Sequence, residues 1–168
     1  LNIETKFIMG LRVTDPKVIK VIEDVMIEFN AEIVNALKKK MCTAKPITIK
    51  ENNAIYVQQK NKELGYVGSP TKVDTKLIKN FIHKDFVPIV APMGLDEKNQ
   101  AYNINADTVA GALAISLKSR RLLLMTDVEG VYDENKKLIS EIKSTEAERL
   151  IYNQTIHGGM IPKIRTCI

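Results

Sequence analysis

The sequence predicts an α/β fold with an open, mainly parallel sheet that is sandwiched by helices. Residues 86–92 and 121–126 are rich in consecutive apolar side chains, as strands buried on both faces of a parallel sheet are. Segments with apolar residues at three- and four-residue spacing alternate with these runs and indicate helices. Strands that alternate with helices are typical of a sheet covered on both faces.

The first half of the chain is expected to hold a long helix, short strands and a second helix. Asp15 and Pro16 predict the helix start, because Asp caps well and Pro is favoured in the first turn. The expected inward stripe consists of Val18, Ile22, Val25, Phe29, Ile33 and Leu37. Short extended segments are expected at residues 47–49, 54–57 and 65–68, and a helix at 75–84.

The second half is expected to continue the alternation. Residues 86–92 predict a buried strand, 95–102 a polar turn and 107–118 a helix. The run at 121–126 predicts another buried strand, residues 145–152 a helix, and Gly158-Gly159 the opening of a last helix. Ligands of such sheets bind at the carboxyl ends of strands, so the polar clusters after residues 92 and 125 are the places to look for chemistry.

Composition excludes several classes of protein. The 168 residues carry a net charge of +5 and include no Trp, 5 Tyr and 4 Phe, which argues against a nucleic-acid surface and suits anionic substrates. Two cysteines cannot build a disulfide framework or a four-ligand zinc site, and His83 and His157 are expected to be structural, so no metal site is expected. No apolar stretch approaches the ~20 residues that span a bilayer, so a membrane is not expected as a partner. Nucleic acid is not expected as a partner either, because of the mild charge and the few aromatic residues.

The first candidate cluster is Asn103, Asn105 and Asp107. In an extended segment these alternating residues would lie on one side and offer amide donors and a carboxylate to one bound molecule. The alternative is that Asp107 only caps the helix that follows.

Three further clusters could bind parts of a nucleotide or a carboxylate. Thr126 and Asp127 could bond a ribose or an adenine edge, although Asp-x-x-Gly is also a common turn. Gly158-Gly159 would let backbone N–H groups approach phosphate oxygens, with Lys163 adding charge, or would be a turn beside a surface lysine. Arg12 could bind a carboxylate through two parallel hydrogen bonds, or could be an exposed structural arginine.

Taken together and in this order, the clusters resemble the acetylglutamate kinase family of the amino acid kinase superfamily. The similar blocks are Phe7–Asp15, Leu64–Gly68, Pro88–Asp107, Leu122–Tyr132 and Gly158–Lys163, and the similarity extends over nearly the whole chain. The resemblance implies an amino acid kinase-like fold and phosphoryl transfer from ATP, with Mg²⁺, to the side-chain carboxylate of N-acetyl-L-glutamate in arginine biosynthesis. It also implies a homodimer or higher homo-oligomer in the cytoplasm, or in the plastid stroma. Another member of the superfamily, such as a glutamate 5-kinase, aspartokinase or uridylate kinase, remains an alternative.

The resemblance also implies a role for each site residue. Arg12, with Gly10 and Leu11, would hold the α-carboxylate of the substrate, and Asn103 and Asn105 would contact its polar groups. Asp107 would organise the catalytic lysines, and Lys163 would neutralise the transferring phosphoryl group. The residues expected along the nucleotide are Thr126, Asp127, Gly159 and Met160.

The family pattern further implies two lobes and an incomplete or gapped chain. Residues 1–117 would form the amino-acid-substrate lobe, lacking its first strands, and residues 118–168 part of the nucleotide-binding lobe. The family's glycine-rich loops and amino-terminal catalytic lysine do not precede Leu1, and its last strands do not follow Ile168. A strand with a Gly-Lys-Asp-type turn is expected to be missing between Lys40 and Met41. A non-catalytic truncated remnant is the alternative to a chain joined across gaps.

Overall fold

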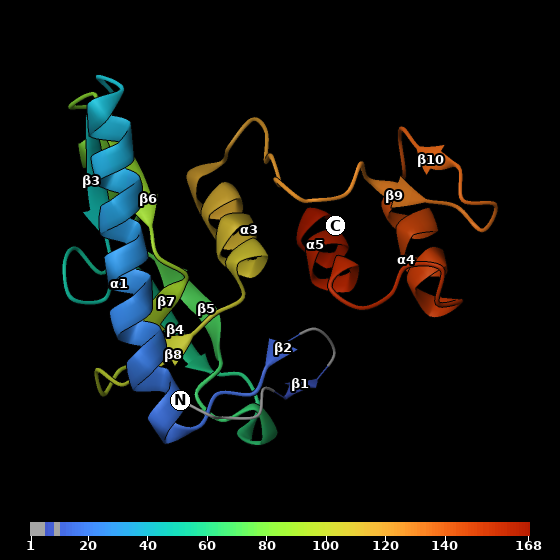
Figure 1. Ribbon diagram of the computed structural model, residues 1–168, viewed down its shortest axis with the longest axis horizontal. Coiled ribbons are helices and arrows are strands. Elements are labelled where there is room, and N and C mark those ends of the chain that lie inside the picture. Colours follow the sequence, from blue (N-terminus) through green and yellow to red (C-terminus); the bar gives the residue numbers. More distant parts are fainter. Residues whose placement is uncertain (1–5, 9–10) are drawn as a thin grey trace.

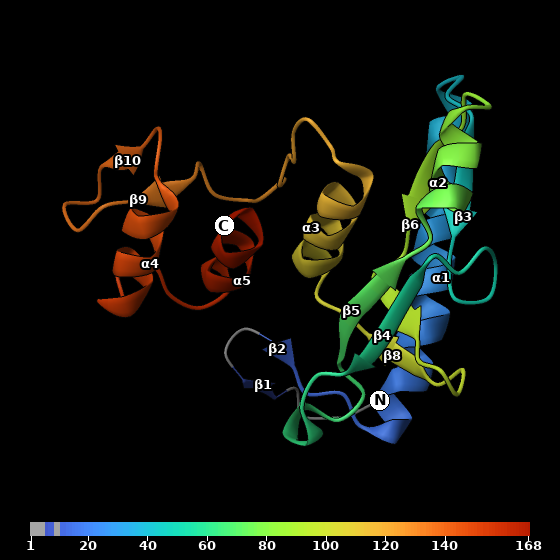
Figure 2. The same cartoon turned by 180° about the vertical axis from the view of Figure 1, so that it is seen from behind.

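The computed structural model describes residues 6–8 and 11–168, and its fold is α/β, as expected. Figure 1 shows helix α1, Pro16–Lys39, lying along one side of the strands, and Figure 2 shows helix α2, Thr75–Ile82, on the opposite side. Helix α3, Ala106–Leu117, stands between the strands and the last helices, α4 (Ser144–Tyr152) and α5 (Met160–Cys167). The expected open sheet covered by helices is therefore confirmed.

The start of α1 is as expected, and its inward face is as expected in part, because Val18, Ile22, Ile33 and Leu37 are half-buried. One carboxylate oxygen of Asp15 accepts hydrogen bonds from Lys17 N at 2.8 Å and from Val18 N at 2.9 Å. Val25 and Phe29, expected to point inward, are 51% and 55% exposed. The residues of α1 that are buried are Ile19 and Asn30. The expectation failed for Val25 and Phe29 because α1 is apolar on more than one side, so the pattern alone could not select the packed one.

The strands form open sheets with mixed pairing. β3, Ala44–Ile47, pairs in parallel with β6, Val87–Val90. The four-stranded sheet has the order β5-β4-β7-β8. Its strands are β4 (Ile55–Gln59), β5 (Gly68–Val73), β7 (Met93–Leu95) and β8 (Ala101–Asn103).

The expectation of mainly parallel pairing is wrong for the described strands. Only β3–β6 and β4–β7 are parallel, whereas β4–β5 and β7–β8 are antiparallel. The short hairpins β1–β2, Phe7–Ile8 with Leu11–Arg12, and β9–β10, Val131–Tyr132 with Leu138–Ile139, are antiparallel as well. The reason is that these strands follow one another without a crossover helix, and such short connections allow only antiparallel pairing.

A strand, β3, follows α1 directly. Helix α1 closes with Cys42 N donating to Leu37 O at 3.0 Å, and the chain then enters β3 directly. A polar turn follows, in which Glu51 N donates to Thr48 Oγ1 at 3.0 Å, and leads into β4. The strand expected at 47–49 therefore lies earlier, as β3, and the gap expected between Lys40 and Met41 stays a prediction. The sequence Ala-Lys-Pro-Ile hid β3, because only Ile47 of this strand is buried.

The strand expected at residues 121–126 is also wrong. These residues are irregular, and Leu123 and Met125 are 80% and 88% exposed. A strand needs a neighbour to receive its backbone hydrogen bonds, and among the described residues none pairs with this segment. The apolar run therefore forms an irregular connection between α3 and β9.

The hydrophobic core comprises separate clusters. Two join the strands to α2 and α3 through Ile55, Val57, Val109, Ile47 and Ile78. The third lies within the last part of the chain and consists of Ala147, Leu150, Ile156 and Ile164. The division into lobes at residue 117 remains a prediction, and separate clusters agree with it. Across the described part of the chain, none of the helices combines the length and apolar character that crossing a bilayer requires.

Candidate active site

Asp107 and Lys163 form an ion pair that joins two helices distant in sequence. Lys163 Nζ donates to both carboxylate oxygens of Asp107, each at 3.1 Å. The side chains are 25% exposed for Lys163 and 17% for Asp107, so the pair is accessible without being freely solvated. Asp107 also lies in the first turn of α3, where the helix dipole stabilises a carboxylate. A fixed, accessible ammonium group is what an anionic substrate requires.

The helix cap is Asn105 and not Asp107. Asn105 Oδ1 accepts from Thr108 N at 3.1 Å and from the Thr108 hydroxyl at 3.3 Å. The capping alternative for Asp107 is therefore wrong, and its carboxylate is free to pair with Lys163. The idea that Asn103, Asn105 and Asp107 lie along one extended segment is also wrong, because Asn103 ends β8 while Asp107 is helical.

Gly111 allows the two helices to approach closely. A Cβ atom at this position would lie 2.6 Å from Thr166 Cγ2 of α5. Gly111 is one turn beyond Asp107 and Thr166 nearly one turn beyond Lys163, so the close contact lies beside the ion pair. The sequence analysis passed over this glycine, which sits inside a helical pattern where a tight helix contact is a common reason for glycine.

Asn103 and Arg12 lie on neighbouring elements. Asn103 Nδ2 donates to Thr14 Oγ1 at 3.3 Å, which ties the end of β8 to the segment that follows β2. The Arg12 guanidinium lies over the Phe7 ring, 5.1 Å from its centroid, on an exposed hairpin. Gly10, expected beside Arg12, lies outside the described residues.

A groove of about 470 Å³ runs between the two halves of the chain. Leu11 of β2 lines it together with Thr108 and Gly111 of α3 and Ile161 and Pro162 of α5. The groove therefore brings the predicted substrate segment at β2 next to the helices that carry Asp107 and Lys163.

The residues expected along the nucleotide do not all line the same hollow. Thr126 donates to Asp127 Oδ1 at 3.3 Å, and both side chains are exposed on the connection before β9. Met160 lines a separate hollow of about 240 Å³ with Val128, Gly130 and His157. At its edge Tyr132 donates to Glu129 Oε2 at 3.0 Å, and this hydrogen bond raises the pKa of Tyr132.

The two glycines before α5 leave open space. Among the described residues, no heavy atom outside the adjacent residues lies within 4 Å of the Cβ that a side chain at Gly158 or Gly159 would add. Gly158 has φ +58°, in the left-handed region that favours glycine. Packing therefore does not explain Gly159, and the backbone ahead of α5 is accessible to a ligand.

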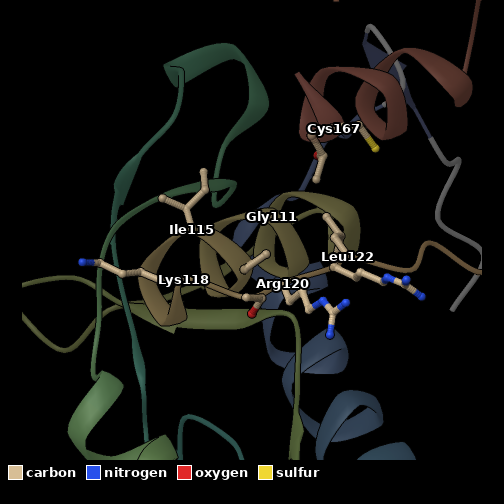
Figure 3. Close-up of a pocket in the computed structure, with 10 residues that line it drawn as sticks. Gly111, Ile115, Lys118, Arg120, Leu122 and Cys167 are labelled. Atoms are coloured by element: carbon tan, nitrogen blue, oxygen red, sulfur yellow. The ribbon is translucent and has the colours of Figure 1, made fainter. Parts of the chain in front are cut away.

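A second groove lies along the α3–α5 contact and shares Gly111 and Thr166 with the first (Figure 3). It is lined by Ile115, Lys118, Arg120, Leu122 and Cys167, among others, and holds none of the residues expected to act on substrate or nucleotide. Within the described ranges, no group of three or more His, Cys, Asp or Glu side chains could hold a metal ion.

The chain is similar to curated acetylglutamate kinases. It is 55% identical to that of Pelagibacter ubique (strain HTCC1062) over 168 residues, which are all of this chain and 58% of the relative. It is 41% identical to the enzyme of Brucella canis over 182 residues, again all of this chain and 62% of the relative. The chain thus spans about three fifths of these relatives. The Pelagibacter alignment is as long as this chain, whereas the Brucella alignment spans 182 positions against the 168 residues of this chain, so these relatives differ in the residues they carry inside the match.

Solved structures share the fold. The smu.665 protein of Streptococcus mutans UA159 superposes with a TM-score of 0.92 at 29% identity, covering 98% of this chain and 67% of that one. An N-acetylglutamate synthase from Neisseria gonorrhoeae, complexed with coenzyme A and N-acetyl-glutamate, gives 0.81 at 18% identity over 97% of this chain and 38% of that one, a likeness of fold alone. The sequence profile described as the amino acid kinase family matches residues 1–168 in full. With that match over the whole length, and with the α/β fold and the ion pair between α3 and α5, the chain belongs to the amino acid kinase family.

Proposed function

We propose that this chain is part of an acetylglutamate kinase, which transfers the γ-phosphoryl group of MgATP to the side-chain carboxylate of N-acetyl-L-glutamate in arginine biosynthesis. An oxygen of the carboxylate forms a bond to the γ-phosphorus, the bond to the bridging β–γ oxygen breaks, and ADP leaves. The observation that carries the proposal is the Asp107–Lys163 ion pair, which fixes an ammonium group between the two halves of the chain. The 55% identity to the Pelagibacter enzyme supports the choice of substrate.

The proposed roles follow from charge and position. Phosphoryl transfer between two anions depends on positioning and on cations near the oxygens that gain charge. Lys163 would neutralise the transferring group, and Asp107 would hold Lys163 in place. Arg12, with Leu11 and Gly10, would bind the α-carboxylate of acetylglutamate, and Asn103 its other polar groups. Asn105 would act on the substrate only through its Nδ2, because its Oδ1 caps α3.

The nucleotide would lie over the last part of the chain. Thr126, Asp127 and Met160 would follow its base and sugar, and the open backbone at Gly159 would face its phosphates. Mg²⁺ would enter as part of the substrate MgATP, because Mg²⁺ in kinase sites is commonly bound through nucleotide phosphates and only one or two carboxylates.

Two alternatives make different predictions. Another amino acid kinase would phosphorylate glutamate, aspartate or UMP in preference to acetylglutamate, and a non-catalytic remnant would phosphorylate none of them. A panel of these acceptors with MgATP, assayed on the intact protein that contains this chain, separates the three. Acyl phosphate formed with acetylglutamate well above the other acceptors supports the proposal, and no preference for acetylglutamate contradicts it.

We also propose that the protein is a cytoplasmic homodimer, or a higher homo-oligomer, formed through α1. Val21, Val25 and Phe29 are 40%, 51% and 55% exposed, and their spacing of four residues places them along one side of the helix. Light scattering of dilute protein should give at least twice the mass of one chain. A monomer mass would contradict this interface.

A further inference from the structure

We propose that Thr14 is a positioning residue that holds Arg12 and Asn103 in one fixed arrangement for the acceptor substrate. The inference rests on the proposed function, because Arg12 and Asn103 are the residues assigned to acetylglutamate. Thr14 has no exposed surface, so it cannot contact the substrate itself.

The Thr14 hydroxyl joins the two binding residues directly. Its Oγ1 donates to Arg12 O at 3.2 Å and accepts from Asn103 Nδ2 at 3.3 Å. One hydroxyl group can donate one hydrogen bond and accept others, so both contacts form at the same time. The donation restrains the backbone from which the Arg12 side chain extends. The acceptance fixes which way the Asn103 amide faces.

A second route connects the same residues through the backbone. Thr14 N donates to Leu64 O at 2.9 Å, and Thr14 O accepts from Tyr66 N at 2.7 Å. Asn103 N in turn donates to Tyr66 O at 2.9 Å. Residues 64–66 therefore lie between Thr14 and β8, and the hydroxyl contact closes the loop of hydrogen bonds.

Gly65 is required for this close approach. It has φ +67°, and a Cβ atom there would lie 2.2 Å from Thr14 O. Any other residue would push Thr14 away from the 64–66 segment and would be strained in its own backbone. Backbone hydrogen bonds already hold Thr14 against residues 64–66. The hydroxyl contacts are therefore expected to affect mainly the positions of Arg12 and Asn103.

The test compares Thr14→Val, which keeps the shape and removes the hydroxyl, with Thr14→Ser, which keeps the hydroxyl. Thr48→Val is the matched control, because Thr48 is a buried threonine whose contacts are with Glu51 in a turn that holds no proposed site residue. Thr14→Val should raise KM for acetylglutamate about three- to tenfold, the worth of one or two hydrogen bonds, and leave KM for ATP unchanged. Thr14→Ser and Thr48→Val should keep the wild-type KM. Thr14→Ala replaces Thr14→Val if that variant does not fold.

The inference is overturned by an unchanged KM for acetylglutamate in the variant without the hydroxyl, or by an equal rise in Thr14→Ser. A rise in KM for both substrates also overturns it, because that indicates a general loss of structure. A readout independent of activity is the NMR signal of the Asn103 side-chain amide, which should shift in Thr14→Val and not in Thr14→Ser. Wild-type protein that does not phosphorylate acetylglutamate refutes the proposed function, and the Asn103 signal then decides the Thr14 contact by itself: no shift refutes it.

Discussion

Replacing Asp107 by Asn tests whether the ion pair serves catalysis or only stability. The change preserves size and removes the charge, and it leaves one oxygen where Lys163 Nζ now has two at 3.1 Å. Hydrogen bonds to charged groups contribute about 1.5–3 kcal/mol, and each 1.36 kcal/mol of barrier is tenfold in rate. If the full contribution is used to orient Lys163 in the transition state, kcat should fall about 10- to 100-fold.

The effect on stability should be small. The Lys163 side chain is 25% exposed, so its ammonium group can be hydrated once the carboxylate is gone. Exposed pairs contribute about 0–1 kcal/mol, so the free energy of unfolding should drop by about 1 kcal/mol or less. This split between activity and stability is the signature of a positioning role.

The assay measures kcat and the melting temperature of Asp107→Asn side by side. Asp74→Asn is the matched control, because Asp74 also stands at a helix start, where it accepts from Leu77 N at 3.0 Å, and it forms no ion pair within the described part of the chain. That variant should keep full activity. If Asp107→Asn retains the wild-type kcat, Asp107 does not belong to the site and the reasoning is refuted.

Three other changes have distinct expected results. Lys163→Ala should lower kcat by ~10²–10³, a loss of ~3–4 kcal/mol of transition-state stabilisation; a loss below tenfold would contradict its role. Arg12→Ala should raise KM for acetylglutamate and leave KM for ATP nearly unchanged, and equal changes in both would assign Arg12 to the fold. Hydrogen bonds from the backbone N–H of Gln100 and of Lys98 hold the pKa of Asp96 below its ordinary value of 3.8. Asp96 therefore contributes stability that is present above that pH and lost below it, so urea unfolding of Asp96→Asn should show a weaker loss in acid than wild type; an identical acid profile would exclude this contribution.

Local signals in the sequence predicted several helices well. Asp15-Pro16 marked the start of α1, and the periodic residues after Thr75 predicted α2 to within two residues of its end. These elements follow from short-range chemistry, namely a side-chain cap and an apolar stripe. The helix at 145–152 was found from its apolar residues in the same way, whereas the last helix was predicted from the Gly158-Gly159 pair that precedes it.

Tertiary contacts decided the elements that were predicted wrongly. The apolar run at 121–126 has the composition of a strand but finds no partner among the described strands, so it stays irregular. In α1 the packed side includes Asn30, whose Nδ2 donates to Ile89 O of β6 at 2.8 Å. Its Oδ1 is buried and has no hydrogen-bond partner among the residues that the structure describes. A polar residue in the packed face has no signal in a hydrophobicity pattern.

In the candidate site, too, some features could be predicted from the sequence and others depend on tertiary contacts. Asp107 and Lys163 are 56 residues apart, so their pairing was implied by family resemblance and could not be derived from spacing. Thr14 and Gly111 were not singled out, because a hydroxyl contact across the fold and a close helix approach depend on the folded neighbours. The residue types at the site could be predicted from the sequence, and the contacts that position them could not.

The most direct test of the account is a structure of the intact protein with acetylglutamate and a non-hydrolysable ATP analogue bound together. The account predicts the α-carboxylate of acetylglutamate at Arg12, the analogue along Thr126 and Met160, and Lys163 between the side-chain carboxylate and the γ-phosphate, still paired with Asp107. Acetylglutamate bound away from Arg12, or a γ-phosphate with no contact to Lys163, would contradict it.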